Sequence, residues 1–187
     1  MRNKLYFMVM IMVFFFSCKE ENFPKQKGYL NLEYPTSTYH KTSLNCPFAF
    51  EVASQTKILA NQKCWVKIKY PKLNAIIDIT YLPVKNNLKR LSLEAEKLTT
   101  KHSIKADKIS FLPYINKEQK VYGKMSNVTG NAASPIQFHA TDSTHHFITG
   151  ALYFNVQPNY DSILPAVNYI EKDIVHLMET LKWKKSQ

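Results

Sequence analysis

The chain has 187 residues, of which 45% are hydrophobic and 13% are aromatic, and its formal net charge is +11. This length and apolar content suffice for one folded domain with its own core, and they exclude a second domain of ordinary size and extensive disorder. Most of the positive charge is lysine, whereas phosphate-binding sites more often use the arginine fork, so the charge does not indicate a nucleic-acid partner.

The N-terminus has the order of a secretory signal. Arg2 and Lys4 precede twelve apolar residues, 5–16, and the small residue Ser17, and this run is too short to span a bilayer comfortably. Cys18 follows directly, and Phe15-Phe16-Ser17-Cys18 resembles the lipobox of bacterial lipoproteins. We therefore expect residues 1–17 to be a lipoprotein signal peptide and Cys18 to become the acylated mature N-terminus. The alternative is ordinary cleavage that leaves Cys18 unmodified.

Residues 18–27 are polar and are predicted to be a flexible tether ahead of a single globular domain, 28–187. Removal of Arg2 and Lys4 with the signal lowers the net charge to +9. Lys19-Glu20-Glu21 resembles the short signal that carries some lipoproteins of the Bacteroidetes to the cell surface, and a plain solvated tether is the alternative. Acyl chains on Cys18 would hold the domain next to a membrane.

Alternation of apolar and polar residues predicts strands in the first half of the chain, at 28–35, 48–52, 64–70 and 75–82. In the third of these, Cys64, Val66, Ile68 and Tyr70 face one way and lysines face the other. Trp65 lies on the lysine side, where we expect a helix or loop to cover it.

Cys46 and Cys64 are the two cysteines that remain if Cys18 carries lipid. In an extracytoplasmic compartment they are expected to form a disulfide, which stabilises the fold by roughly 3 kcal/mol through the loop it closes. Two buried thiols are the alternative, and two cysteines alone cannot form a zinc site.

A helical period begins at Asn86 and continues to about His102. Strands are predicted near 109–112 and 121–128, followed by a hairpin of 136–141 and 144–156 that turns at Asp142-Ser143. A long helix is predicted to close the chain, starting behind Asp161 or Ser162 and ending at Trp183, with Pro165 in its first turn. The expected fold is α+β, a single-domain antiparallel sheet covered by helices. Its element order resembles the α/β/α sandwich of the PsbP and Mog1-like proteins.

The densest group of reactive side chains lies in that last hairpin: His139, Asp142, Ser143, His145 and His146. A tight turn would place His139 and His146 opposite each other on one face. A third metal ligand would have to come from far away, and no strained nucleophile sequence surrounds Ser143, so we expect no metal, no cofactor and no enzyme. Two interpretations remain. These residues either stabilise a turn and fill ordinary strand positions, or form a partner-binding rim composed of Asn131, His139, Asp142 and His146.

Several separated segments together resemble the gliding-motility lipoprotein GldD family of the Bacteroidetes. They include Gly28-Tyr29-Leu30, Cys46-Pro47-Phe48, Cys64-Trp65, Tyr70-Pro71-Lys72, Gly130-Asn131-Ala132-Ala133-Ser134, Thr141-Asp142-Ser143-Thr144 and the run 158–167. The resemblance implies an accessory lipoprotein of the cell envelope, anchored in the outer membrane, that gliding and type IX secretion require. Its partners would be other envelope proteins of that machinery, which it would contact as a scaffold. The alternative function is an envelope carbohydrate-binding module or hydrolase that uses the hairpin from His139 to His146.

Overall fold

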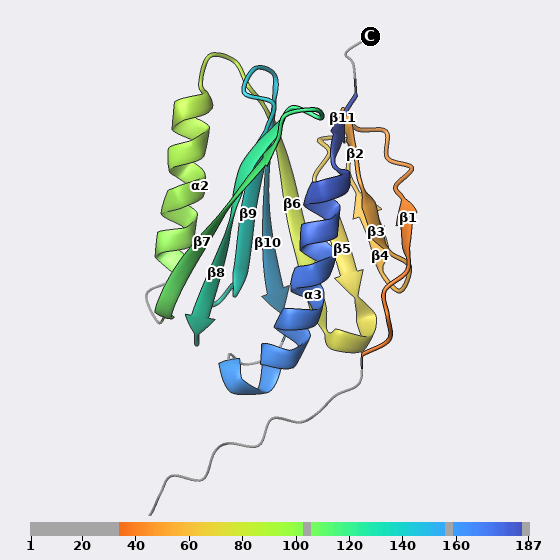
Figure 1. Cartoon of the computed structure of the whole chain (residues 1–187), viewed down its shortest axis with the longest axis vertical. Helices are drawn as coiled ribbons and strands as arrows, with labels where there is room; N and C mark the ends of the chain where they lie inside the picture. The colour runs from red at the N-terminus through yellow and green to blue at the C-terminus, as the bar shows by residue number, and fades with distance from the viewer. Residues whose placement is uncertain (1–33, 103–105, 156–158, 185–187) are drawn as a thin grey trace, which may run out of the picture.

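The computed structural model describes residues 34–102, 106–155 and 159–184. The predicted signal peptide, Cys18, the tether and most of the first predicted strand lie outside the described residues. Figure 1 shows a central sheet flanked by helices. Its strands follow the order β4-β5-β6-β10-β9-β8-β7, and every neighbouring pair is antiparallel. The strands are β1 (Tyr39–Lys41), β2 (Phe48–Ala49), β3 (Glu51–Ala53), β4 (Lys57–Ala60), β5 (Val66–Tyr70), β6 (Ala75–Pro83), β7 (Ala106–Asn116), β8 (Val121–Gly130), β9 (Ile136–Thr141), β10 (His146–Phe154) and β11 (Lys182–Trp183).

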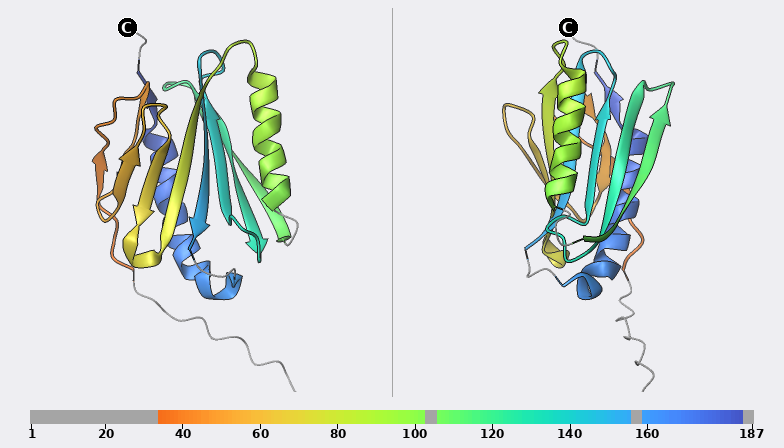
Figure 2. Two further views of the ribbon diagram at one scale, coloured as in Figure 1. Left: turned by 180° about the vertical axis from the view of Figure 1, so that it is seen from behind. Right: turned by 90° about the vertical axis from the view of Figure 1, so that its left-hand side faces the viewer.

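The helices lie on opposite faces of the sheet, as the right-hand view of Figure 2 shows. Helix α3 (Tyr160–Thr180) covers one face together with the small pairs β1-β3 and β2-β11. Helix α2 (Leu88–His102) lies on the other face, next to β9 and β10. The expected α+β fold with an antiparallel sheet and a long C-terminal helix is therefore confirmed.

The core lies between the sheet and α3. Every second residue of the central strands points into it, including Val66 and Ile68 of β5 and Ile77 and Ile79 of β6, all about 1% exposed. From the helix, Ile170, Ile174 and Leu177 fill the opposite side with the helical spacing that the sequence predicted. Each such side chain contributes roughly 1.5–3 kcal/mol by leaving water, so this layer holds the fold together.

The cysteine pair is joined in the structure. Cys46 and Cys64 form a disulfide with their Cα atoms 5.6 Å apart, which confirms the pairing that the cysteine count predicted. The bridge connects the segment before β2 to the residues that lead into β5. It therefore fastens the small β2-β11 pair to the main sheet.

Trp65 corrects one prediction. Its side chain is 47% exposed, and the Nζ atom of Lys63 lies 5.5 Å from its ring centroid. We expected a helix or loop to cover this ring, but α2 packs beside β9 and β10 and leaves the β4-β5 end of this face open.

The C-terminal helix begins earlier than predicted, and it ends at Thr180 and not at Trp183, which lies in β11. It starts at Tyr160, so Pro165 lies in the second turn of α3 and not in the first. The short pairs formed by β1, β4 and β11 were also not predicted, since two to four residues are too few for a period to stand out. Tyr34 and Pro35, the described end of the first predicted strand, have no strand conformation.

Candidate functional site

The hairpin between β9 and β10 turns more widely than the sequence suggested. Asp142 Oδ1 accepts hydrogen bonds from the backbone N–H groups of Thr144, His145 and His146 at 2.8–3.0 Å. Ser143 adopts a left-handed conformation with φ 70°. Burial alone would raise the pKa of Asp142, but these N–H donors hold it below its usual value. Asp142 and Ser143 therefore build the turn, as one of the two interpretations expected.

This loop separates the two histidines that a tight turn would have brought together. Thr141 pairs with Phe147, so His139 lies opposite Thr149. His146 points to the α3 side of the sheet and His139 to the α2 side. The expected facing pair is wrong, because the Asp142 hydrogen bonds extend the loop to four residues, 142–145.

His146 is buried in a contact between the hairpin and the C-terminus. Its Nδ1 atom lies 3.0 Å from the hydroxyl of Tyr81, and its ring stacks on Trp183. Burial lowers the pKa of His146, while the nearby Asp142 carboxylate acts in the opposite direction. These contacts give His146 a packing role.

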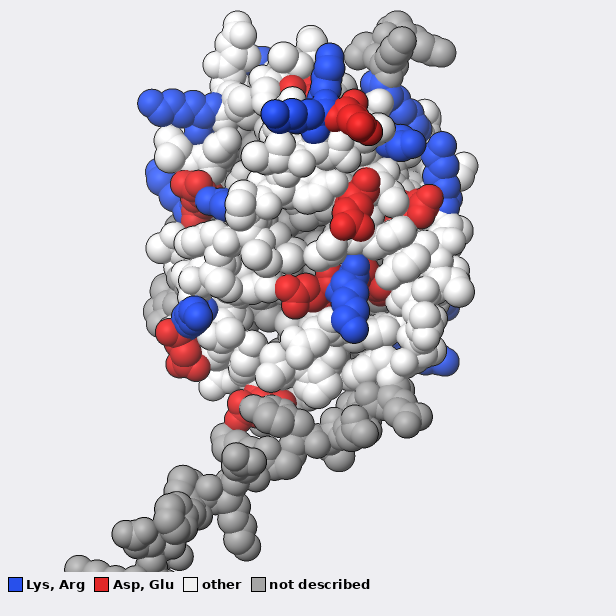
Figure 3. Space-filling model, in the orientation of Figure 1, with Lys and Arg blue, Asp and Glu red and all other residues white. Residues whose placement is uncertain are grey.

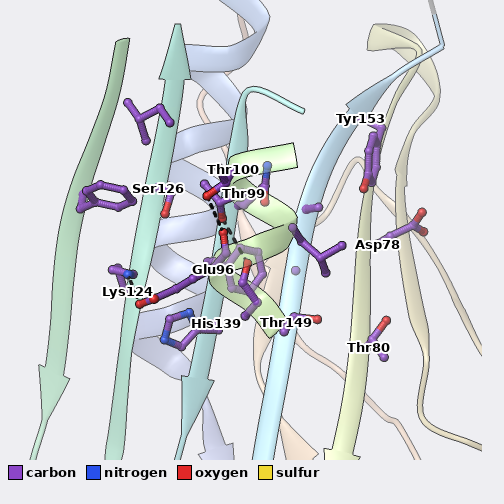
Figure 4. A pocket seen from close by; sticks show the side chains of 18 residues that line it. Asp78, Thr80, Glu96, Thr99, Thr100, Lys124, Ser126, His139, Thr149 and Tyr153 are labelled. Carbon is purple, nitrogen blue, oxygen red and sulfur yellow. Dashed lines mark hydrogen bonds and ion pairs between the residues drawn. The ribbon is translucent and has the colours of Figure 1, made fainter. Parts of the chain in front are cut away.

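His139 lies on the other face, beside a charged pair that links a strand to α2. Its ring stacks on Phe147 with centroids 5.6 Å apart. Lys124 Nζ lies 2.7 Å from Glu96 Oε1 and 4.8 Å from the ring centroid of Phe111. Figure 4 shows Lys124, Glu96 and His139 at one side of a pocket. Burial, and then the charge of Lys124, lower the pKa of His139.

Asn131 has a structural role of its own. Its Oδ1 atom accepts a hydrogen bond from the backbone N–H of Tyr160, at 3.1 Å, and so caps the first turn of α3. It precedes β9, whereas Asp142 follows that strand. The four residues of the predicted rim therefore do not form one cluster, and a partner contact by any of them stays a prediction.

Charged and metal-binding groups show no concentration. Within the described ranges, no three His, Cys, Asp or Glu side chains are grouped closely enough to hold a metal ion. On the face seen in Figure 3, acidic side chains and large uncharged areas lie between the lysine and arginine side chains, although several of the basic ones are close together near the top and upper right.

The longest strand of the sheet is also an edge. Ten of the eleven residues of β7 pair with β8 on one side, and Asp107 is left out at a bulge. In the part of the chain that the structure describes, no strand pairs with the other side of β7. Phe111, Leu112 and Ile115 are 54%, 48% and 66% exposed. Sequence reasoning placed a strand here but missed this surface. The sequence feature that could have indicated this surface is the adjacent pair Phe111-Leu112. Two neighbouring apolar residues break the alternation of apolar and polar side chains and place one apolar side chain on each face of the strand.

Residues 19–183 match the model of the family described as gliding motility lipoprotein GldD. The chain belongs to this family. No curated protein matches the chain. The match spans nearly every residue of the predicted mature protein, which confirms the resemblance seen in the separate segments.

Membership in the GldD family makes this chain a lipoprotein associated with the cell envelope and with gliding motility. Among the described residues, neither α2 nor α3 has the length and apolar character needed to cross a membrane. Cys18, the predicted attachment point for lipid, lies outside the described residues. Within the described residues, β7 is the longer of the two edge strands of the main sheet, and it exposes apolar side chains.

Proposed function

We propose that this lipoprotein is an accessory scaffold of the gliding and type IX secretion machinery. Acyl chains on Cys18 hold the domain at the outer membrane, and the free edge of β7 binds an extended segment of another envelope protein. Which side of the membrane the domain faces depends on Lys19-Glu20-Glu21, the sequence that resembles a surface-export signal.

The β7 edge is the observation that supports protein binding. An exposed edge strand offers a row of unpaired N–H and C=O groups, and proteins commonly shield such edges or use them to bind another strand. Here, Pro113 lies in the middle of the strand and has no N–H, so a partner strand would pair with the residues on either side of it and would also cover Leu112 and Ile115. The opposite edge, β4, has only four residues, so it offers a partner fewer backbone groups than the eleven residues of β7 do.

The role in type IX secretion follows from what the family resemblance implies. The arrangement of helix, sheet and helix also supports the predicted likeness to the PsbP and Mog1-like sandwich. That likeness concerns fold alone and implies no activity.

The proposal includes the absence of catalysis. His139 and His146 point to opposite faces of the sheet. Ser143 lies in the loop between β9 and β10, and its backbone N–H donates a hydrogen bond to Thr141 Oγ1. A hydrolase needs a nucleophile beside a histidine that an acid orients. The separation of the two histidines argues against the hydrolase that the hairpin suggested.

The test replaces the apolar side chains of the edge with lysine, which natural edges use to prevent strand pairing. Leu112→Lys combined with Ile115→Lys should abolish gliding and the secretion of adhesins. It should also remove the partner from pull-downs of detergent-solubilised envelopes. Leu93→Lys is the control, because Leu93 lies on α2 and not on an edge strand, and is 48% exposed.

Lipid labelling and thermal melting of each variant establish that it is anchored and folded. Loss of motility, secretion and partner recovery in the β7 variant alone is the expected outcome. Normal motility and secretion in an anchored and folded β7 variant would contradict binding through this edge.

A further inference from the structure

A groove of about 560 Å³ lies between α2 and the sheet, on the face opposite the core. The C-terminal half of α2 contributes Glu96 and Thr99, and strands β6, β8, β9 and β10 supply the floor. Figure 4 shows Asp78, Thr80, Ser126, His139 and Thr149 distributed over those strands. The groove is lined in part by Phe111 of β7, but not by Leu112 or Ile115.

Gln137 is the residue that points to a ligand. Its side chain lines the groove, is only 6% exposed, and has an Nε2 atom with no hydrogen-bond partner. A solvated sheet face would satisfy such a donor with water, and buried amide groups without partners are rare because they are unfavourable. Because Gln137 lines the groove, an acceptor bound there would supply the missing partner. The missing partner is a hydrogen-bond acceptor.

The charges along the groove are neutralised within the protein. Asp78 pairs with Lys67 at 2.8 Å, and Glu96 pairs with Lys124 at 2.7 Å. A phosphate or carboxylate ligand would require cationic groups that are not already paired. The arrangement therefore favours a neutral ligand that is rich in hydroxyl groups.

A second hollow of about 330 Å³ continues the groove toward β4 and shares Asp78 and Thr80 with it. Trp65 lines this hollow, and Tyr153 and Phe111 line the groove. From β5 to β7 the sheet has five strand spacings, or roughly 24 Å at about 4.8 Å each. Aromatic rings are therefore distributed along a track long enough for several linked sugar rings.

We propose that this track binds a neutral oligosaccharide chain. The ring faces of Trp65 and Phe111 that Lys63 and Lys124 do not cover pack against the C–H faces of sugar rings. The side chains of Gln137, Thr80 and Thr149 hydrogen-bond the sugar hydroxyl groups, in the mixture of apolar and polar contacts typical of small-ligand sites. An extended peptide fits less well, because backbone groups in the middle of a sheet are already paired and cannot bond a peptide backbone. The proposal does not depend on the scaffold role.

The test uses the full-length lipoprotein in a detergent without a sugar head group, and saturation-transfer NMR. The probes are cellohexaose and lipid-free neutral oligosaccharides released from the surface polysaccharide of the same cells. At least one probe should bind, and Trp65→Ala and Gln137→Met should each weaken binding by about tenfold or more, since tenfold is the effect of one lost contact of ordinary strength. Leu112→Lys, on the other face of β7, should bind as the wild type does.

Gln137→Met removes the unpaired donor at nearly constant side-chain size, so it should melt no lower than the wild type. A variant that melts lower and binds normally would show that Gln137 has only a structural role, and would overturn the proposal. The proposal would also be overturned if neither probe bound the folded wild type, or if an extended peptide occupied the track and no oligosaccharide did. Because Leu112→Lys tests the edge and Gln137→Met tests the groove, failure of one proposal is distinguishable from failure of the other.

Discussion

His146 stacks on Trp183 with ring centroids 5.2 Å apart and an angle of 12° between the ring planes. Trp183 belongs to β11, which pairs with β2, and its indole Nε1–H donates to the carbonyl of Lys120 at 3.0 Å. The last described residues of the chain are thus held against both the β9-β10 hairpin and the β7-β8 turn. A histidine ring in this position makes the packing of the C-terminus sensitive to pH.

The free energy of unfolding should fall as the pH is lowered below about 6.5, the usual histidine pKa. Burial lowers the pKa of His146 and of His139, so the unfolded chain takes up protons at a higher pH than the folded chain does. The two neutral histidines therefore contribute their full stabilisation at pH values above the histidine pKa of the unfolded chain. This stabilisation is lost as the pH falls from that value toward the lower pKa values of the folded protein. Urea denaturation at pH 7.5 and at pH 5 measures this loss.

His146→Gln keeps a hydrogen-bonding group near Tyr81 and cannot be protonated, so it should lose less stability between the two pH values than the wild type. His145→Gln, at the neighbouring exposed position, is the control and should behave as the wild type does. An equal loss in His146→Gln and the wild type would show that the stacked ring is not a source of the pH dependence.

Tyr70→Phe should destabilise the domain by about 1.5–3 kcal/mol, the usual range for a hydrogen bond to a charged group. The buried carboxylate of Asp173 in α3 accepts hydrogen bonds from Tyr70 at 3.0 Å and from Tyr39 at 2.8 Å. Burial and the Asp173 charge raise the pKa of Tyr70, and the same causes raise that of Tyr39 to about 12. Tyr39→Phe should have the smaller effect because Tyr39 is only half-buried. Equal effects in urea denaturation would contradict this ranking.

Reduction of the Cys46–Cys64 bridge should lower the free energy of unfolding by roughly 3 kcal/mol, because the reduced chain regains the freedom of the closed loop when it unfolds. Thermal melting with and without a reductant measures the change. The double variant Cys46→Ser with Cys64→Ser should melt like the reduced wild type and show no response to reductant. An unchanged melting temperature on reduction would argue that the bridge adds nothing.

Cys18→Ser should abolish incorporation of a clickable fatty acid and release the domain from membranes, because the acyl chains provide the anchor. In-gel fluorescence of labelled cells and fractionation of membranes measure the two effects. The variant Cys46→Ser with Cys64→Ser should still be labelled. Labelling of Cys18→Ser would place the lipid elsewhere.

The periodic parts of the fold could be predicted from the sequence. Val66, Ile68 and Tyr70 alternate along β5 as expected, and Ile170, Ile174 and Leu177 keep the helical spacing of α3, because each pattern reflects burial against one neighbour. The cysteine pairing could also be predicted, since Cys18 was assigned to lipid and left two partners.

What could not be predicted depends on contacts between distant or irregular segments. The position of His146 depends on three backbone hydrogen bonds to Asp142, and sequence alone did not reveal that this side chain would extend the loop. The exposure of Trp65 depends on where α2 docks. The free edge at β7 depends on strand order, which local periodicity does not determine.

Binding through the β7 edge is the central claim, and photo-crosslinking in living cells tests it most directly. A photoreactive phenylalanine analogue replaces Ile115 on β7 in one strain and Leu59 on β4 in another, with the lipoprotein otherwise unchanged. We predict that irradiation joins the Ile115 variant to a specific envelope protein and that the Leu59 variant gives no such product. No crosslink from Ile115 in motile, secreting cells, or the same products from both positions, would contradict the account.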